Sequence, residues 1–179
     1  MADKKIYVLM TRYPGRDAKF LSWYTRFPYT HTSIGFEDDM DTFYTFVSKG
    51  FFIESIKKYN KPDREPFPCA LYEITVPEKT YYNVKKLVLS YKAKKEKLKY
   101  STLGLVCCFL KIPLRRKNKY FCSHFVAEVL QQSRILPPEK KSTLYFPKDI
   151  SRHKELKLIF IGHHLSFVEN FVKKSNKND

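Results

Sequence analysis

The stretch from Lys119 to Leu130 constrains the fold more than any other part of this 179-residue chain, because it places a cysteine at the start of an amphipathic helix. The apolar residues after Cys122 recur with helical spacing: Phe125, Val126, Val129 and Leu130. A cysteine in a first helical turn lies near unpaired backbone N–H groups and the positive end of the helix dipole, which both favour the thiolate. The pattern predicts either a nucleophilic thiol or a small core residue, since free cysteine is among the most buried residue types.

A thiol nucleophile needs a base, and the candidate is His31. His124 is close in sequence, but two residues along a helix correspond to about 200° of rotation, so His124 points away from Cys122. Alternating residues over 32–37 predict a short strand that begins at His31, and a turn at 38–41 followed by a strand over 42–48 completes a hairpin. A histidine on a rigid strand is suited to general-base chemistry. The alternative is a histidine that only hydrogen-bonds a loop carbonyl.

The order of these features resembles a known superfamily. A histidine opens a strand hairpin, a long insertion follows, and residues 120–127 form a Tyr-Phe-Cys-Ser-x-Phe-Val-Ala motif at a helix start. This order is similar to the circularly permuted branch of the NlpC-type papain-like superfamily, which includes the YiiX/YaeF-like proteins and, more distantly, lecithin retinol acyltransferase-like enzymes. The resemblance covers residues 4–162. It implies a cysteine hydrolase or acyltransferase in which Cys122 is the nucleophile and His31 the base.

The resembling family uses a third polar residue, on the strand after the histidine, to orient the imidazole. The strand predicted over 42–48 has no histidine and no carboxylate, so Thr45 is the first candidate, followed by Ser48 and Glu54. A hydroxyl orients an imidazole but stabilises imidazolium less than a carboxylate does. The Cys122 backbone N–H is one expected oxyanion donor. Candidates for a second donor are Tyr13 and Tyr29.

The pattern of elements predicts an α+β fold, an antiparallel sheet packed against helices with the cysteine at a helix N-terminus. The resemblance implies the permuted papain-like (NlpC-type) version of that fold. Strands are predicted at 6–11, 31–48 (the hairpin), 70–76 and 156–161, and helices at 16–24, 77–97, 101–110, 122–133 and 164–172. Residues 49–68 are predicted to be an irregular insertion and 144–150 a turn region. We expect one domain over residues 1–172 and a frayed basic tail over 173–179.

Composition excludes a disordered chain, because 43% of the residues are hydrophobic and 16% aromatic. The four cysteines have no disulfide-framework spacing, which predicts a reducing compartment. No metal or other cofactor is expected, and the pair His163-His164 is interpreted as a loop or cap feature. No stretch is typical of a signal peptide or a membrane span, and the apolar segment 103–110 is predicted to be a buried helix. We therefore expect a cytoplasmic protein.

The net charge of +16 comes from 34 lysines and arginines against 18 acids. The basic residues cluster over 85–99, 115–119 and 173–177. Such fields attract phosphates, nucleic acid or anionic lipid, although a solvated helix face is the alternative. Lysine dominates over grouped arginines and aromatics, which argues against a nucleic-acid reader. Two classes of function remain: an enzyme with a small-molecule, peptide or lipid acyl substrate, and a non-catalytic module that docks an anionic partner through its lysine-rich surface.

Overall fold

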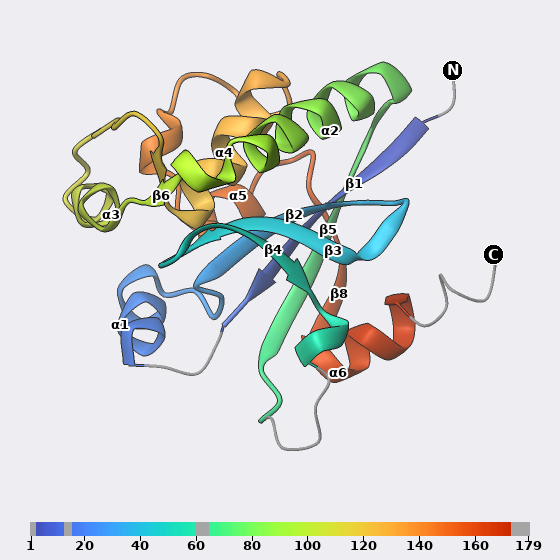
Figure 1. Cartoon of the computed structure of the whole chain (residues 1–179). Helices are drawn as coiled ribbons and strands as arrows, with labels where there is room; N and C mark the ends of the chain where they lie inside the picture. Colours follow the sequence, from blue (N-terminus) through green and yellow to red (C-terminus); the bar gives the residue numbers. More distant parts are fainter. Residues whose placement is uncertain (1–2, 13–15, 60–64, 173–179) are drawn as a thin grey trace.

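A six-stranded antiparallel sheet with the order β4-β3-β2-β1-β5-β8 forms the centre of the protein (Figure 1). The computed structural model describes residues 3–12, 16–59 and 65–172. The strands of the sheet are β1 (Asp3–Thr11), β2 (His31–Phe36), β3 (Asp39–Val47), β4 (Gly50–Ser55), β5 (Pro68–Pro77) and β8 (Lys157–His163). A separate parallel pair is formed by β6 (Lys99–Tyr100) and β7 (Lys119–Tyr120).

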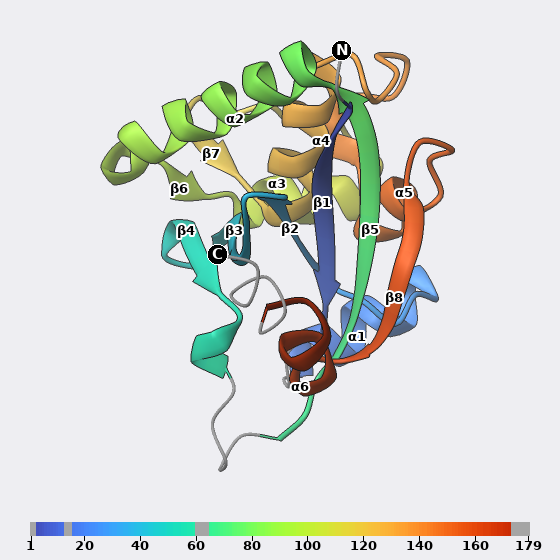
Figure 2. The same cartoon turned by 90° about the vertical axis from the view of Figure 1, so that its right-hand side faces the viewer.

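Helices cover both faces of this sheet, so the fold is α+β as predicted. The α-helices are α1 (Arg16–Thr25), α2 (Glu78–Ala93), α3 (Thr102–Phe109), α4 (Cys122–Gln132), α5 (Pro147–Ser151) and α6 (His164–Phe167), and α6 continues as a π-helical turn, η4 (Val168–Val172). Short 3₁₀ turns are η1 (Lys57–Tyr59), η2 (Lys95–Lys97) and η3 (Ser142–Leu144). Helices α2 and α4 pack on one face, and α6 with η4 packs on the other (Figure 2).

Strand β1 shows why its sequence is a continuous apolar run. Ile6, Val8 and Met10 point into the core shared with α2 and α4, whereas Tyr7 and Leu9 point into the core shared with α6. Successive side chains of a strand alternate between faces, so a strand that is covered on both sides needs apolar residues at every position. Its antiparallel neighbours are β2 and β5.

The prediction of an irregular insertion over 49–68 is wrong, because this segment contains β4 and η1. Strand β4 has an inverted polarity: Phe52 and Ile53 are exposed, whereas the carboxylate of Glu54 is buried. Gly50 begins the strand with a φ of 102°, and a Cβ there would lie 2.4 Å from the backbone oxygen of Leu98. A strand that hides its charge and exposes its apolar residues does not follow the usual amphipathic pattern.

Two other segments also differ from expectation. Helix α3 is at the surface, because Leu103, Val106 and Leu110 are exposed, so its prediction as a buried helix is wrong. The region expected to be a turn holds the short helix α5, which begins at Pro147. The tail expected over 173–179 lies outside the described residues.

Three helices end in the same way, with a basic residue in the left-handed conformation. The φ angles are 49° for Arg26 after α1, 58° for Lys111 after α3 and 58° for Arg134 after α4. In each case the N–H of this residue and of the next one bond back to carbonyls of the last turn, the Schellman arrangement. Glycine is the usual residue at this position because it has no Cβ to clash. A basic side chain there is favoured by the negative end of the helix dipole.

Arg134→Gly is expected to raise the free energy of unfolding by up to about 1 kcal/mol, because glycine adopts the left-handed conformation without strain. The matched control is Arg152→Gly at the end of α5, where φ is −88°. There glycine only adds backbone freedom to the unfolded chain, so a loss of about 0.5–1 kcal/mol is expected. Urea unfolding of the two variants measures both changes in unfolding free energy. Losses of equal size would contradict the gain expected for Arg134→Gly.

Candidate active site

Helix α4 is buried over most of its length, and its packing fixes the position of Cys122. Every residue from Cys122 to Leu130 is buried. The ring of Phe125 packs against Phe46 and Phe51, at centroid distances of 5.2 and 5.7 Å. The hydroxyl of Ser123 donates to the backbone oxygen of Tyr145 at 2.6 Å, which anchors the first turn. The start of the helix is therefore held on both its sheet side and its loop side.

The Cys122 thiol lies at the point where β2 and β3 separate. The pairing of these strands extends only as far as Ile34 and Tyr44, which leaves the backbone of Thr32 available to other partners. The backbone N–H groups of Thr32, Ser123 and Cys122 itself act on the Cys122 thiol and lower its pKa, against the larger opposite effect of burial. The thiol predicted from the helix motif is thus near the backbone of the residue next to His31.

His31, the predicted base, is held by the predicted orienting residue. The Nε2 atom of His31 lies 3.2 Å from Oγ1 of Thr45, and this hydroxyl donates to the backbone oxygen of Thr32 at 2.8 Å. Thr45 has one hydroxyl hydrogen, which the Thr32 carbonyl takes, so its oxygen accepts from Nε2–H. The imidazole therefore carries its proton on Nε2, and Nδ1 is the ring nitrogen without a proton.

A carboxylate from the neighbouring strand also faces the imidazole. Oε2 of Glu54 lies 4.0 Å from Nε2 of His31. Glu54 pairs with Phe43 across β3 and β4, and residues 43 and 45 of β3 share a face of the sheet, so Glu54 and Thr45 reach the imidazole together. The sequence ranked Glu54 behind Thr45 and Ser48. The third candidate, Ser48, is exposed in the turn between β3 and β4 and does not belong to this group.

Burial keeps the resting site uncharged. It lowers the pKa of His31 to about 4 and raises the pKa of Cys122 to about 11, although the backbone N–H groups partly offset the effect on the thiol. Burial also raises the pKa of Glu54 to about 7, against a hydrogen bond from Tyr59. The expectation of a thiolate favoured by the helix terminus is therefore wrong for the resting protein. The Cys122 residue is only 7% exposed, and desolvation outweighs the dipole.

A second layer behind Glu54 comes from the elements near α6, on the sheet face that Glu54 shares with Phe43. The hydroxyl of Tyr59 donates to Oε1 of Glu54 at 3.3 Å. The ring of His164 accepts from the N–H of Phe67 at Nδ1 and donates from Nε2 to the oxygen of Tyr59, both at 3.2 Å. His164 also stacks on Phe67 with a centroid distance of 3.9 Å. The histidine expected as a loop or cap residue thus anchors the turn that carries Tyr59.

His124 belongs to a separate buried cluster, as its position on the helix predicts. Its Nε2 lies 3.3 Å from Glu128, which also receives hydrogen bonds from Arg115 and from Ser142. This cluster ties the loop before β7 and the turn η3 to the middle of α4. It supports the helix that carries Cys122 without contributing a partner to the thiol.

Two tyrosines were expected as candidates for the second oxyanion donor. Tyr29 packs in the core, with its ring 5.4 Å from that of Phe27, and Tyr13 lies outside the described residues. A third tyrosine, Tyr100, has its pKa raised by burial first and then by the charge of Cys122. Sequence reasoning missed Tyr100, which lies in a two-residue strand that leaves no periodic pattern.

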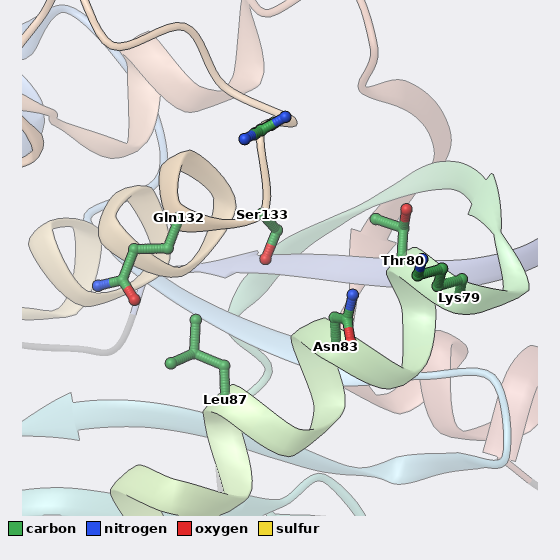
Figure 3. A pocket seen from close by; sticks show the side chains of 7 residues that line it. Lys79, Thr80, Asn83, Leu87, Gln132 and Ser133 are labelled. Atoms are coloured by element: carbon green, nitrogen blue, oxygen red, sulfur yellow. The ribbon is translucent and has the colours of Figure 1, made fainter.

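A hollow of about 450 Å³ lies at the opposite end of α4 (Figure 3). Its lining comes from Lys79, Thr80, Asn83 and Leu87 of α2 and from Gln132, Ser133 and Arg134 at the end of α4. Ten helical residues separate Gln132 from Cys122, a rise of about 15 Å. This hollow is therefore not a substrate pocket for the thiol.

Within the described ranges, no group of three or more His, Cys, Asp or Glu side chains is placed to hold a metal ion. None of the helices in the same part of the chain has the length and apolar character needed to cross a bilayer. A scan against protein-family models and a search of curated proteins found no match to the sequence.

Two buried threonines allow a matched test of the hydrogen bonds around His31. Thr45→Val removes the partner of both the Thr32 carbonyl and the His31 Nε2–H, so a loss of about 1–3 kcal/mol in unfolding free energy is expected. Thr32→Val is the control, because the Thr32 hydroxyl is buried and has no hydrogen-bond partner among the described residues. Its replacement by a methyl group is expected to be neutral or to stabilise by up to about 1 kcal/mol. Chemical denaturation distinguishes the two, and equal losses would count against the assigned role of Thr45.

The raised pKa of Glu54 gives a pH-dependent test of stability. The folded protein binds a proton on Glu54 more tightly than the unfolded chain does, so folding stability falls as pH rises from about 4.5 to about 7. Glu54→Gln removes this loss, and its stability relative to the parent should grow over that window to about 3 kcal/mol at pH 8.

Glu128→Gln is the control of opposite sign. Burial alone would raise the pKa of Glu128, but the hydrogen bond and charge of His124 and the charge of Arg115 lower it. The ionised form therefore stabilises the fold at neutral pH and this stabilisation is lost in acid. Thermal unfolding of Glu128→Gln should show a deficit at pH 7 that shrinks at low pH. The same pH trend in both variants would show that the charge state of Glu54 has been misassigned.

Proposed function

We propose that this protein is a cysteine hydrolase or acyltransferase that acts on an amide, ester or thioester. The observation that carries the proposal is the held imidazole of His31, whose Nε2 lies 3.2 Å from Oγ1 of Thr45 and 4.0 Å from Oε2 of Glu54. The backbone of the next residue, Thr32, acts on the thiol of Cys122 at the N-terminus of α4. A thiol nucleophile and an oriented imidazole are the two groups that acyl-thioester chemistry requires.

The proposal includes the permuted branch of the NlpC-type papain-like superfamily. It is supported by the order of the elements, in which the histidine strand β2 precedes the cysteine helix α4, and by the antiparallel sheet on which α4 packs. A reducing compartment such as the cytoplasm would suit the chemistry, because all four cysteines are free thiols and Cys122 must stay reduced to react.

In the acylation step, the Cys122 sulfur attacks the carbonyl carbon and the new S–C bond forms. The thiol proton passes to Nδ1 of His31, since Nε2 already holds a proton that faces Thr45. Thiol and imidazole are both neutral at rest, so the proton moves during the attack rather than before it. The imidazolium then returns this proton to the leaving group as the bond between the carbonyl carbon and the leaving group breaks.

The site can stabilise both charges that develop in this step. The negative charge on the carbonyl oxygen lies near the backbone N–H groups that begin α4, where Phe121 has no polar side-chain atom to cap them. The positive charge on His31 is offset by Glu54 when this carboxylate is ionised, in addition to the hydrogen bond to Thr45. Glu54 thus supplies a carboxylate, which residues 42–48 lack.

Deacylation reverses the roles of the same groups. Water or another acceptor attacks the acyl-thioester, His31 takes its proton, and the proton returns to the sulfur as the S–C bond breaks. Water as the acceptor makes the protein a hydrolase. An alcohol or amine as the acceptor makes it a transferase with the same residues.

The test is to trap the acyl-enzyme with a small acyl-thioester probe and to find the modified cysteine by intact-mass and peptide analysis. The parent protein should carry one acyl group on Cys122, and Cys122→Ala should carry none there. His31→Ala is expected to slow acylation by about 10²–10⁴-fold, which is the usual contribution of a general base.

Cys107 provides the internal control for non-specific reaction, because it is the half-exposed thiol on α3. Acylation of Cys107 should not depend on His31, and Cys107→Ala should leave acylation of Cys122 unchanged. If the parent protein is acylated only on Cys107, or at the same rate with and without His31, the enzyme proposal fails and a binding module of the same fold becomes the better account.

A further inference from the structure

Helices α1 and α3 together expose a large apolar surface. We call it the α1–α3 patch, and its members are Phe20, Trp23 and Tyr24 from α1 and Leu103, Val106, Leu110 and Ile112 from α3 and the turn after it. Trp23 is 74% exposed and Leu110 65%, which is far above the exposure of a side chain that serves the core. Contiguous exposed apolar surface of this kind marks an interaction site.

The two helices form one surface because their side chains contact each other directly. The hydroxyl of Tyr24 donates to the backbone oxygen of Phe109 at 2.9 Å, and the two rings meet edge to face with centroids 4.7 Å apart. The ring of Phe20 lies between, 6.1 Å from Phe109 and 6.0 Å from Trp23. The aromatic side chains of α1 are therefore fixed next to the aliphatic side chains of α3.

Basic residues dominate the segments that contain the patch. Helix α1 has one acidic residue, Asp17, and no acidic residue occurs in the sequence over 18–36 or over 97–127. Exposed basic residues in these segments include Lys19 and Arg26 beside α1 and Lys111 and Lys117 after α3. Lys111 lies between Leu110 and Ile112, so a cation is surrounded by the most exposed aliphatic side chains.

We propose that the α1–α3 patch docks the protein on an anionic lipid bilayer. Aromatic and aliphatic side chains together with an excess of lysine and arginine are the composition of surfaces that insert between lipid headgroups. Trp and Tyr suit the boundary between headgroups and acyl chains, because each has an apolar body and a polar atom. A second copy of the chain fits less well, because each copy has a net charge of +16.

The patch also adjoins the candidate active site. Helix α1 leads through residues 26–30 into His31, and Cys108 of α3 is close enough to Cys122 for their charges to interact. A bilayer under the patch would lie beside the two elements that carry the base and the nucleophile. The docking itself rests on surface composition and does not depend on the proposed reaction.

Trp23 is the single tryptophan of the chain, so its fluorescence reports on the patch directly. The full-length protein is mixed with vesicles of phosphatidylcholine and phosphatidylserine, or of phosphatidylcholine alone. Emission should shift to shorter wavelength with the anionic vesicles and much less with the neutral ones, and added salt should reverse the shift. The Cys122→Ala protein should behave like the parent.

Two pairs of variants, measured by vesicle co-sedimentation, assign the effect to the patch. Lys111→Gly should weaken binding by about fivefold, the contribution of one basic residue near an anionic surface. It should keep the fold, because glycine suits the φ of 58° at this position. Arg134→Gly is its control, with the same φ of 58° at the end of α4. Leu110→Ser should also weaken binding, whereas Ile161→Ser on the edge strand β8, with the same exposure of 65%, should not.

Three results would overturn the proposal. The first is the absence of any Trp23 shift with anionic vesicles. The second is equal weakening by the patch variants and their controls, which would indicate attraction by net charge alone. The third is a concentration-dependent dimer, seen by light scattering, that Leu110→Ser dissociates, because the patch would then be covered by a second copy.

Discussion

The contact between the start of α4 and the open end of the β2–β3 ladder is the interaction on which the candidate site depends. Because the ladder stops at Ile34 and Tyr44, the N–H of Thr32 can act on the Cys122 thiol, and the Thr32 carbonyl accepts a hydrogen bond from the Thr45 hydroxyl. A fully paired strand would have used both groups for the sheet. The early separation of two strands thus brings the nucleophile and the orienting residue to the same backbone unit.

The same contact explains the electrostatics of the site. Helix α4 is packed so tightly that Cys122 and His31 lose most of their solvent, and desolvation favours the neutral form of each. Glu54 is the group with a pKa near neutrality, and its Oε2 lies 4.0 Å from Nε2 of His31. We infer that the protonation state of this carboxylate decides how well the site stabilises a positive charge on His31. Its support from Tyr59 and His164 links the site to the face of the sheet that α6 covers.

The surface around the site has a different character from its interior. Cys122, His31 and Glu54 are buried polar groups, whereas the adjoining helices α1 and α3 expose aromatic and aliphatic side chains with basic residues between them. In these helices apolar side chains are exposed to solvent, whereas in β2, β3 and β4 polar side chains are buried. This reversal places the docking surface that we propose directly next to the reactive groups.

The sequence alone was sufficient to predict the elements that have strong periodicity, and to nominate Cys122, His31 and Thr45 as candidates. The apolar residues of α4 recur with helical spacing and those of the β2–β3 hairpin alternate, so these elements can be predicted from the sequence. The role of Glu54 was not predictable with the same strength, because β4 hides a carboxylate and exposes Phe52 and Ile53. Strands that break the usual polar and apolar pattern are expected where residues are placed for a functional site rather than for packing.

Some properties were decided only by the tertiary structure. The N-terminal position of Cys122 on a helix indicated a low thiol pKa, but packing buried the thiol and raised its pKa instead. The apolar composition of α3 indicated a buried helix, but the helix packs on α1 at the rim and leaves Leu110 exposed. Local sequence specifies which residues a helix contains, whereas burial and the neighbours of each side chain depend on elements far away in the chain, and these determine both charge state and exposure.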